Sequence, residues 1–139
     1  MSARRKAREL TLKALYAYDI SGAEVEQVST AIIKTSEIKP ESKKFSENLF
    51  VKVVQNIKEI DHLIKQNVKS WDFSRIASIE KNILRLGICE LLYYGDIPPA
   101  ISIDEAIELA KKYGDKDSKN FVNAVLDSIL KELDKKCEK

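Results

Sequence analysis

The sequence has few of the residues that break helices. Its 139 residues include four glycines and three prolines. So few turn-forming residues allow few loops, which favours long helices over many short strands. The glycines stand apart from one another, at positions 22, 87, 95 and 114, so the chain has no glycine-rich loop that could hold a phosphate group.

Cysteine and histidine are too scarce for a disulfide framework or a metal site. Cys89 lies in an apolar stretch and is expected to be buried, whereas Cys137 lies in a charged tail. The single histidine, His62, has no second histidine or cysteine near it and is expected at the surface. Because nucleophilic and metal catalysis need clusters of such groups, we predict a protein that is not an enzyme and uses no metal or cofactor.

Long hydrophobic runs are also missing. No uninterrupted apolar run approaches the roughly 18 residues that cross a bilayer, and no apolar segment of the signal-peptide type follows the basic N-terminus. With so little cysteine, these features predict a cytoplasmic protein that makes no contact with a membrane.

Positive charge is concentrated in residues 1–18. Five bases and one acid give this segment a net charge of +4 in a protein whose total is +2, so the remainder sums to −2. The five bases are Arg4, Arg5, Lys6, Arg8 and Lys13. Bases at the start of a helix oppose its dipole, so helix stability does not explain them. The cluster indicates a polyanionic partner, with a solvated helix end as the alternative.

Apolar residues recur at helical spacing and predict six helices, at about 3–20, 24–36, 42–68, 75–94, 102–113 and 118–133. Gly22 is expected to end the first helix and Ser42 to begin the third. Ser102 and Glu105 have the spacing of a capping box for the fifth. The fourth is apolar around most of its circumference, and Gly87 within it is expected to allow close approach of another helix. The predicted class is all-α.

The length suits a single domain, residues 1–139. A short aromatic segment, Trp71-Asp72-Phe73-Ser74, is expected to join an N-terminal half, about 1–70, to a C-terminal half, about 71–139.

Several motifs resemble those of the bacterial transcription antitermination factor NusB family. Residues 4–9 read RRKARE and are followed at 14–16 by ALY. The second half contains IEKNILR at 79–85, IDEAIELAK at 103–111 and SKNFVN at 118–123. The resemblance covers essentially the whole chain in register, and it is most specific in the second half.

The resemblance implies an all-helical fold of two packed three-helix-type subdomains. It also implies a function, the binding of boxA-type single-stranded RNA together with NusE, a small-subunit ribosomal protein. In the family this complex joins RNA polymerase and makes ribosomal RNA transcription resistant to termination.

The resemblance also assigns roles to particular residues. It places the N-terminal bases Arg4, Arg5, Lys6 and Arg8 on the RNA, together with Phe121 of the FVN motif and Asp117 just before it. It places Tyr16, which ends the ALY motif, and Glu80 of the fourth helix on the NusE surface.

The residues themselves leave alternatives open. Phe121 continues the apolar stripe of the sixth helix and Tyr16 could line the core edge, so either could be a packing residue. Glu80 has no base three or four residues away on its own helix, which favours a partner role. The family usually has glycine where this chain has Ala124, a change that a helix should tolerate.

Two other classes of function compete with this one. The first is a helical protein–protein adaptor whose basic end is incidental. The second is the RNA-binding domain of an RNA methyltransferase, an interpretation weakened because no cofactor-binding segment is present in the sequence.

Overall fold

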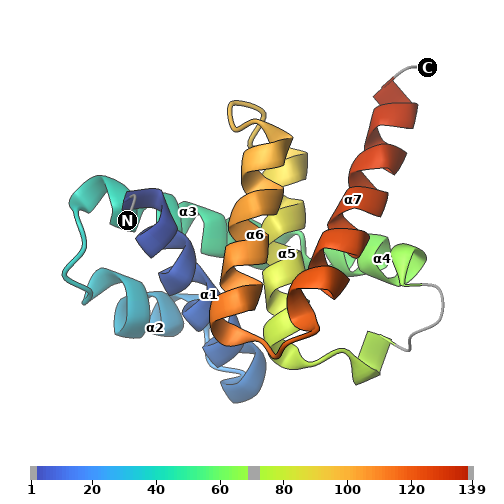
Figure 1. The fold of residues 1–139 in the computed structure, drawn as a ribbon. Coiled ribbons are helices and arrows are strands. Elements are labelled where there is room, and N and C mark those ends of the chain that lie inside the picture. Colours follow the sequence, from blue (N-terminus) through green and yellow to red (C-terminus); the bar gives the residue numbers. More distant parts are fainter. Residues whose placement is uncertain (1–2, 69–72, 138–139) are drawn as a thin grey trace. The chain divides into compact units, whose positions relative to one another are not determined.

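A computed structural model describes residues 3–68 and 73–137, with side chains to residue 135 (Figure 1). The predicted all-α class is confirmed, since this part of the chain contains helices and no strand. It forms two compact units, one within residues 1–56 and one within 57–139. Of the expected aromatic joint, Trp71 and Asp72 lie outside the described residues, and the boundary between the units instead follows Asn56.

The first unit consists of helices α1 (Ala3–Ser21), α2 (Val25–Val28) and α3 (Pro40–Gln55), with a π-helical segment, η1 (Ser29–Lys34), between α2 and α3. Helix α1 packs against α3 and η1. The predicted first helix and its glycine end are confirmed. Gly22 has a φ of 69°, and its N–H donates to the carbonyl oxygen of Tyr18 at 3.1 Å.

A buried polar contact joins α1 to α3. The hydroxyl oxygens of Thr11 and Ser46 lie 2.9 Å apart, and both residues are fully buried. Thr11 Oγ1 also donates to the carbonyl oxygen of Ala7 at 3.0 Å, so neither hydroxyl lacks a partner. These short side chains let the two helices meet closely.

Helix α3 begins at Pro40, so the prediction that Ser42 starts it is wrong. Proline suits the first helical position because it has no N–H to leave unpaired and its φ is already helical. Ser42 is instead buried within the first turn.

The predicted long helix over 42–68 is also wrong, because it is two helices, α3 and α4 (Ile57–Asn67). Asn56 separates them, with φ −116° and ψ 19°. Its side-chain amide donates to the carbonyl oxygen of Lys52 at 2.8 Å, and its backbone N–H donates to the same oxygen at 3.2 Å. The asparagine thereby closes the last turn of α3.

The second unit is built around α5 (Ser78–Tyr93), which contacts α4, α6 (Pro99–Tyr113) and α7 (Ser118–Cys137). A single 3₁₀ turn, η2 (Phe73–Arg75), precedes α5. Residues 82–90 are all buried, as predicted for a central helix. A Cβ on Gly87 would lie 3.0 Å from Leu126 Cδ1, which confirms the expected close approach of α5 to another helix.

An ion pair holds α4 to α5. The Nε and Nη2 atoms of Arg85 donate to the two carboxylate oxygens of Asp61 at 2.8 and 2.9 Å, and Nη1 donates to Asn82 Oδ1 at 3.0 Å. This fork geometry is the strong form of an arginine–carboxylate pair. His62, beside Asp61, is exposed as expected.

The predicted capping box of the fifth helix is wrong, because α6 begins three residues earlier, at Pro99. Ser102 therefore lies inside the helix. It is buried and its hydroxyl donates to Glu90 Oε1 on α5 at 2.8 Å. Proline again takes the first helical position, and the serine is used for packing rather than capping.

Candidate nucleic-acid interface

The N-terminal bases differ in how far they reach solvent. Arg4 and Lys6 are exposed, and Arg5 is partly exposed. Arg8 is only 3% exposed. The first turns of α1 therefore present three cationic side chains to solvent, and the fourth base of the predicted RNA site lies inside the protein.

Arg4 and Arg8 share an aromatic contact that the sequence did not indicate. Their guanidinium carbons lie 4.7 and 5.5 Å from the ring centroid of Phe45, on α3. A guanidinium within about 6 Å of a ring centroid is attracted by the ring. Phe45 is only partly buried, although Leu49, one turn further along α3, is fully buried. The pair of bases just before it, Lys43 and Lys44, is the one sequence signal of an exposed position.

The turn between α6 and α7 is held by its own side chains. Asp115 Oδ1 accepts from the N–H of Asp117 at 2.9 Å, and Ser118 Oγ accepts from the N–H of Asp115 at 3.0 Å. Asp117 is exposed at this turn.

Phe121 lies one turn into α7, where its N–H donates to the carbonyl oxygen of Asp117 at 3.2 Å. Its side chain is partly exposed, whereas its neighbour Val122 is fully buried. The ring is therefore divided between packing and solvent, so neither interpretation of the sequence describes it completely.

Glu80 has an intramolecular partner that inspection of its own helix missed. Its Oε2 accepts a hydrogen bond from Ser118 Oγ at 2.7 Å, across 38 positions of sequence. The carboxylate is partly buried in the first turn of α5. The second unit thus brings Glu80 to the same turn as Asp117.

Gly114 ends α6 immediately before this turn and leaves no room for a side chain. A Cβ there would overlap Ser118 Oγ and would lie 2.8 Å from the carbonyl oxygen of Ala110. The turn is therefore packed tightly around Ser118.

Tyr16 lies on the solvent side of α1. It is 40% exposed, and Ile20, one turn further, is 66% exposed, whereas Leu12 and Leu15 are buried. Packing at the core edge therefore accounts for only part of the Tyr16 side chain, because the rest of it reaches solvent. Of the predicted site residues, Tyr16 and the bases belong to the first unit, and Glu80, Asp117 and Phe121 belong to the second.

The described part of the chain offers neither a metal site nor a membrane span. Within residues 3–68 and 73–137, no three histidine, cysteine, aspartate or glutamate side chains are grouped so that they could hold a metal ion. No helix in that part is long and apolar enough to cross a membrane.

Comparison with protein families gives a match to the model described as the NusB family, over residues 5–131. The chain belongs to the NusB family. It is 43% identical over 133 residues to the transcription antitermination protein NusB of a Nitratiruptor species, a match that covers 96% of this chain and 95% of that protein. It is 44% identical over 126 residues to the protein of the same name from Bacillus mycoides, covering 91% and 95%.

Solved NusB structures have the same fold. T. maritima NusB superimposes with a TM-score of 0.87 at 35% identity, covering 95% of this chain and 93% of that one. A second structure is described as antitermination factors NusB and NusE in complex with dsRNA. Its matching chain has a TM-score of 0.85 at 29% identity, covering 95% of this chain and 98% of that one.

The one departure noted from the usual NusB pattern falls at a permissive position. Ala124 replaces the glycine that commonly follows the FVN motif, and it is exposed within α7. Alanine is favoured over glycine in a helix by about 1 kcal/mol, so the substitution suits the position.

Proposed function

We propose that this NusB-family protein binds boxA-type single-stranded RNA together with NusE, and that the complex acts with RNA polymerase to prevent termination of ribosomal RNA transcription. The observation that carries the proposal is the first turn of α1, which holds bases and no acid. A helix start is stabilised by negative charge, and a bound polyanion would supply the negative charge that the first turn of α1 lacks.

The proposed RNA contacts divide by chemistry. Arg4, Arg5 and Lys6 reach solvent from one end of one helix and contact the RNA there, Arg5 and Lys6 through its phosphates. Arg8 acts from the interior, where it lies over Phe45. Unpaired bases stack on aromatic rings in such proteins, and the partly exposed ring of Phe121 offers one such surface.

Asp117 lies beside Phe121 and can accept hydrogen bonds from base amino groups.

Tyr16 and Glu80 belong to the proposed NusE surface. Tyr16 supports that role because it is an exposed aromatic, a residue type enriched at protein interfaces. The protein acts by binding, not by catalysis, in the cytoplasm, where its RNA is transcribed.

The relatives support both partners. Proteins of this family are named for transcription antitermination, and one solved relative holds NusE and double-stranded RNA. Single-stranded RNA exposes base edges that a duplex hides, so the strandedness preferred by this chain is part of the test.

The test is a titration of the free protein with three RNAs at several salt concentrations. They are a single-stranded boxA-type oligonucleotide, its scrambled counterpart, and a duplex of the boxA sequence. We expect the first to bind best. If about three to five bases neutralise phosphates, log K against log salt should have a slope of roughly −2 to −3.5.

The double variant Arg4→Glu/Arg5→Glu should bind RNA more weakly and flatten the slope, with its thermal melt unchanged. Lys58→Glu, at an exposed base of the second unit, is the matched control. A protein-only adaptor would bind the three RNAs equally poorly and would respond to neither variant. That result would overturn the proposal.

A further inference from the structure

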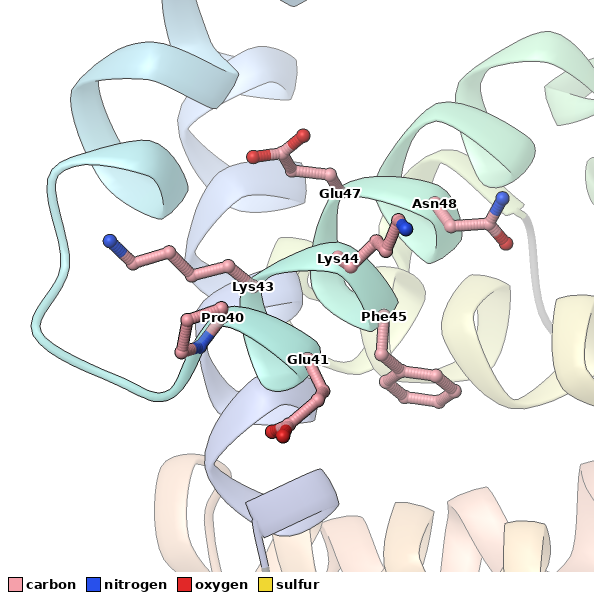
Figure 2. A pocket seen from close by; sticks show the side chains of 7 residues that line it. All are labelled: Pro40, Glu41, Lys43, Lys44, Phe45, Glu47 and Asn48. Atoms are coloured by element: carbon pink, nitrogen blue, oxygen red, sulfur yellow. The ribbon is translucent and has the colours of Figure 1, made fainter.

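The exposed face of α3 carries an aromatic ring among polar side chains. Glu41, Lys44, Phe45 and Asn48 follow one another at helical spacing and line an open hollow of about 800 Å³. Figure 2 shows the Phe45 ring projecting away from the α3 backbone on the side of Glu41, while the Lys44 and Asn48 side chains extend in another direction from the same helix. On the same helix Phe50 is fully buried, so the two phenylalanines of α3 have different surroundings.

Phe45 gives the flexible Arg4 side chain a fixed place. The guanidinium of Arg4 lies 4.7 Å from the ring centroid, while the residue is exposed. Arg8 lies 5.5 Å from the same centroid and is nearly buried, so it contacts the ring from inside the protein. The result is a pair, Phe45 and Arg4, in which a flat guanidinium group lies against an aromatic ring at the surface of the first unit.

The surroundings of this pair suit a nucleotide. Unpaired bases stack on aromatic and guanidinium planes while phosphates meet lysine and arginine. Lys44 is exposed within the hollow. A neighbouring hollow of about 630 Å³ is lined in part by Lys6 and Lys39. Basic side chains therefore continue from the start of α1 to the start of α3.

Acids are present in the hollow but do not reverse its charge. Glu41 and Glu47 line it with Lys43 and Lys44, and Arg4 and Arg8 lie over its ring, which leaves two positive charges in excess. Glu41 and Asn48 can accept hydrogen bonds from base amino groups, and the Asn48 amide can also donate. An apolar peptide would use none of these groups.

We propose that a base of single-stranded RNA stacks on the Phe45–Arg4 pair, with Lys44 on a neighbouring phosphate and Asn48 at the base edge. This site is separate from Phe121, which belongs to the other unit. The proposal rests on the proposed function, because it takes RNA as the ligand. It adds a base-reading site to a unit for which only phosphate contacts have been described above.

Substitution of the ring is the first test. Phe45→Leu keeps apolar packing but removes the π-surface, and we expect it to lower affinity for the single-stranded boxA-type RNA by about five- to a hundredfold. Phe45→Tyr keeps the ring and should bind like the wild type. Phe50→Leu is the matched control, since it removes a buried ring of the same helix. It should lower the melting temperature and leave the affinity of the folded protein unchanged.

The second test concerns Arg4. Arg4→Lys keeps the positive charge but removes the flat guanidinium group, so it should weaken RNA binding when Phe45 is present. In a protein that already carries Phe45→Leu, the same change should cause little further loss of affinity. RNA carrying 5-iodouridine in place of each uridine in turn should cross-link, on irradiation, to the peptide that contains Phe45.

The outcomes separate this site from the proposed function. If the wild type binds RNA and Arg4→Glu/Arg5→Glu does not, but Phe45→Leu binds like the wild type and no cross-link maps to α3, the stacking site is refuted and RNA binding stands. If the wild type does not distinguish the boxA-type RNA from its scrambled counterpart, the proposed function itself fails. The site is supported if Phe45→Leu loses affinity for the RNA while its melting temperature stays normal, and if Phe45→Tyr keeps the affinity of the wild type.

Discussion

The hydroxyl group of Ser118, the first residue of α7, donates a hydrogen bond of 2.7 Å to the carboxylate of Glu80, in the first turn of α5. The same hydroxyl oxygen accepts from the N–H of Asp115 at 3.0 Å. Glu80 therefore has two conceivable roles. It contacts a partner directly, or it holds the turn that carries Asp117.

Substitutions at both ends of this bond separate the two roles. Glu80→Lys replaces attraction by repulsion toward a basic ribosomal protein, so we expect it to weaken NusE binding by about 2 kcal/mol or more. Ser118→Ala removes the bond but keeps the charge of Glu80, and should change NusE binding by less than about 0.5 kcal/mol. Calorimetric titration of NusE into each variant measures both. Equal losses in the two variants would mean that Glu80 acts through the turn.

Gly114 should not tolerate a side chain. In Gly114→Ala the new Cβ would meet Ser118 Oγ and the carbonyl oxygen of Ala110. We expect the free energy of unfolding to fall by about 1–3 kcal/mol, as for other overpacked sites. Gly95→Ala is the matched control, since nothing lies within 4 Å of its Cβ position. Urea unfolding of both variants measures the difference, and equal stability would show that the turn can relax.

Tyr93 makes stability depend on alkaline pH. Desolvation of the hydroxyl, followed by its hydrogen bond to Glu59 at 3.0 Å, raises the pKa of Tyr93 to about 12 from its ordinary 10.0, although the residue as a whole is 37% exposed. The folded protein therefore holds this proton more tightly than the unfolded chain does. The resulting stabilisation is complete below pH 10 and is lost as the pH rises toward 12.

Unfolding of the wild type and of Tyr93→Phe, compared between about pH 8 and 11.5, isolates this contribution. The stability difference between the two proteins should shrink above about pH 10, because only the wild type has this proton to lose. The absorbance of tyrosinate should show one group that titrates late in the wild type and is missing in the variant. A constant stability difference across the range would contradict the assignment.

Hydrophobic periodicity predicted where helices occur but missed several of their ends. The apolar stripe runs through Val53, Ile57 and Ile60 as though one helix continued, yet Asn56 ends α3 with bonds to Lys52. The hydrogen bond from the Asn56 side chain competes with continuation of the helix. A pattern of apolar spacing does not reveal such a bond. Pro40 and Pro99 both begin helices, because proline is favourable in a first turn, whereas the predicted helix starts were Ser42 and Ser102.

The sequence predicted which residue types form the candidate site more accurately than it predicted which residues contact one another. The basic start of α1 was evident from the sequence, but the sequence did not show that Arg8 is buried or that it lies over Phe45, from another helix. Glu80 has no base at helical spacing on its own helix, and its hydrogen-bond partner lies 38 positions away in the sequence. Such contacts follow from tertiary packing and leave no local signal.

We expect the absence of acids from the first turn of α1 to link the order of that helix end to the proposed RNA binding. In the free protein the bases there repel one another and the helix dipole, so low ionic strength is least favourable for the start of α1. Salt relieves this repulsion and at the same time competes with RNA for the bases. If RNA binds at the proposed site, the ionic conditions that best order the free helix end are those under which it binds RNA least. We then expect bound RNA to order the helix end through its own charge.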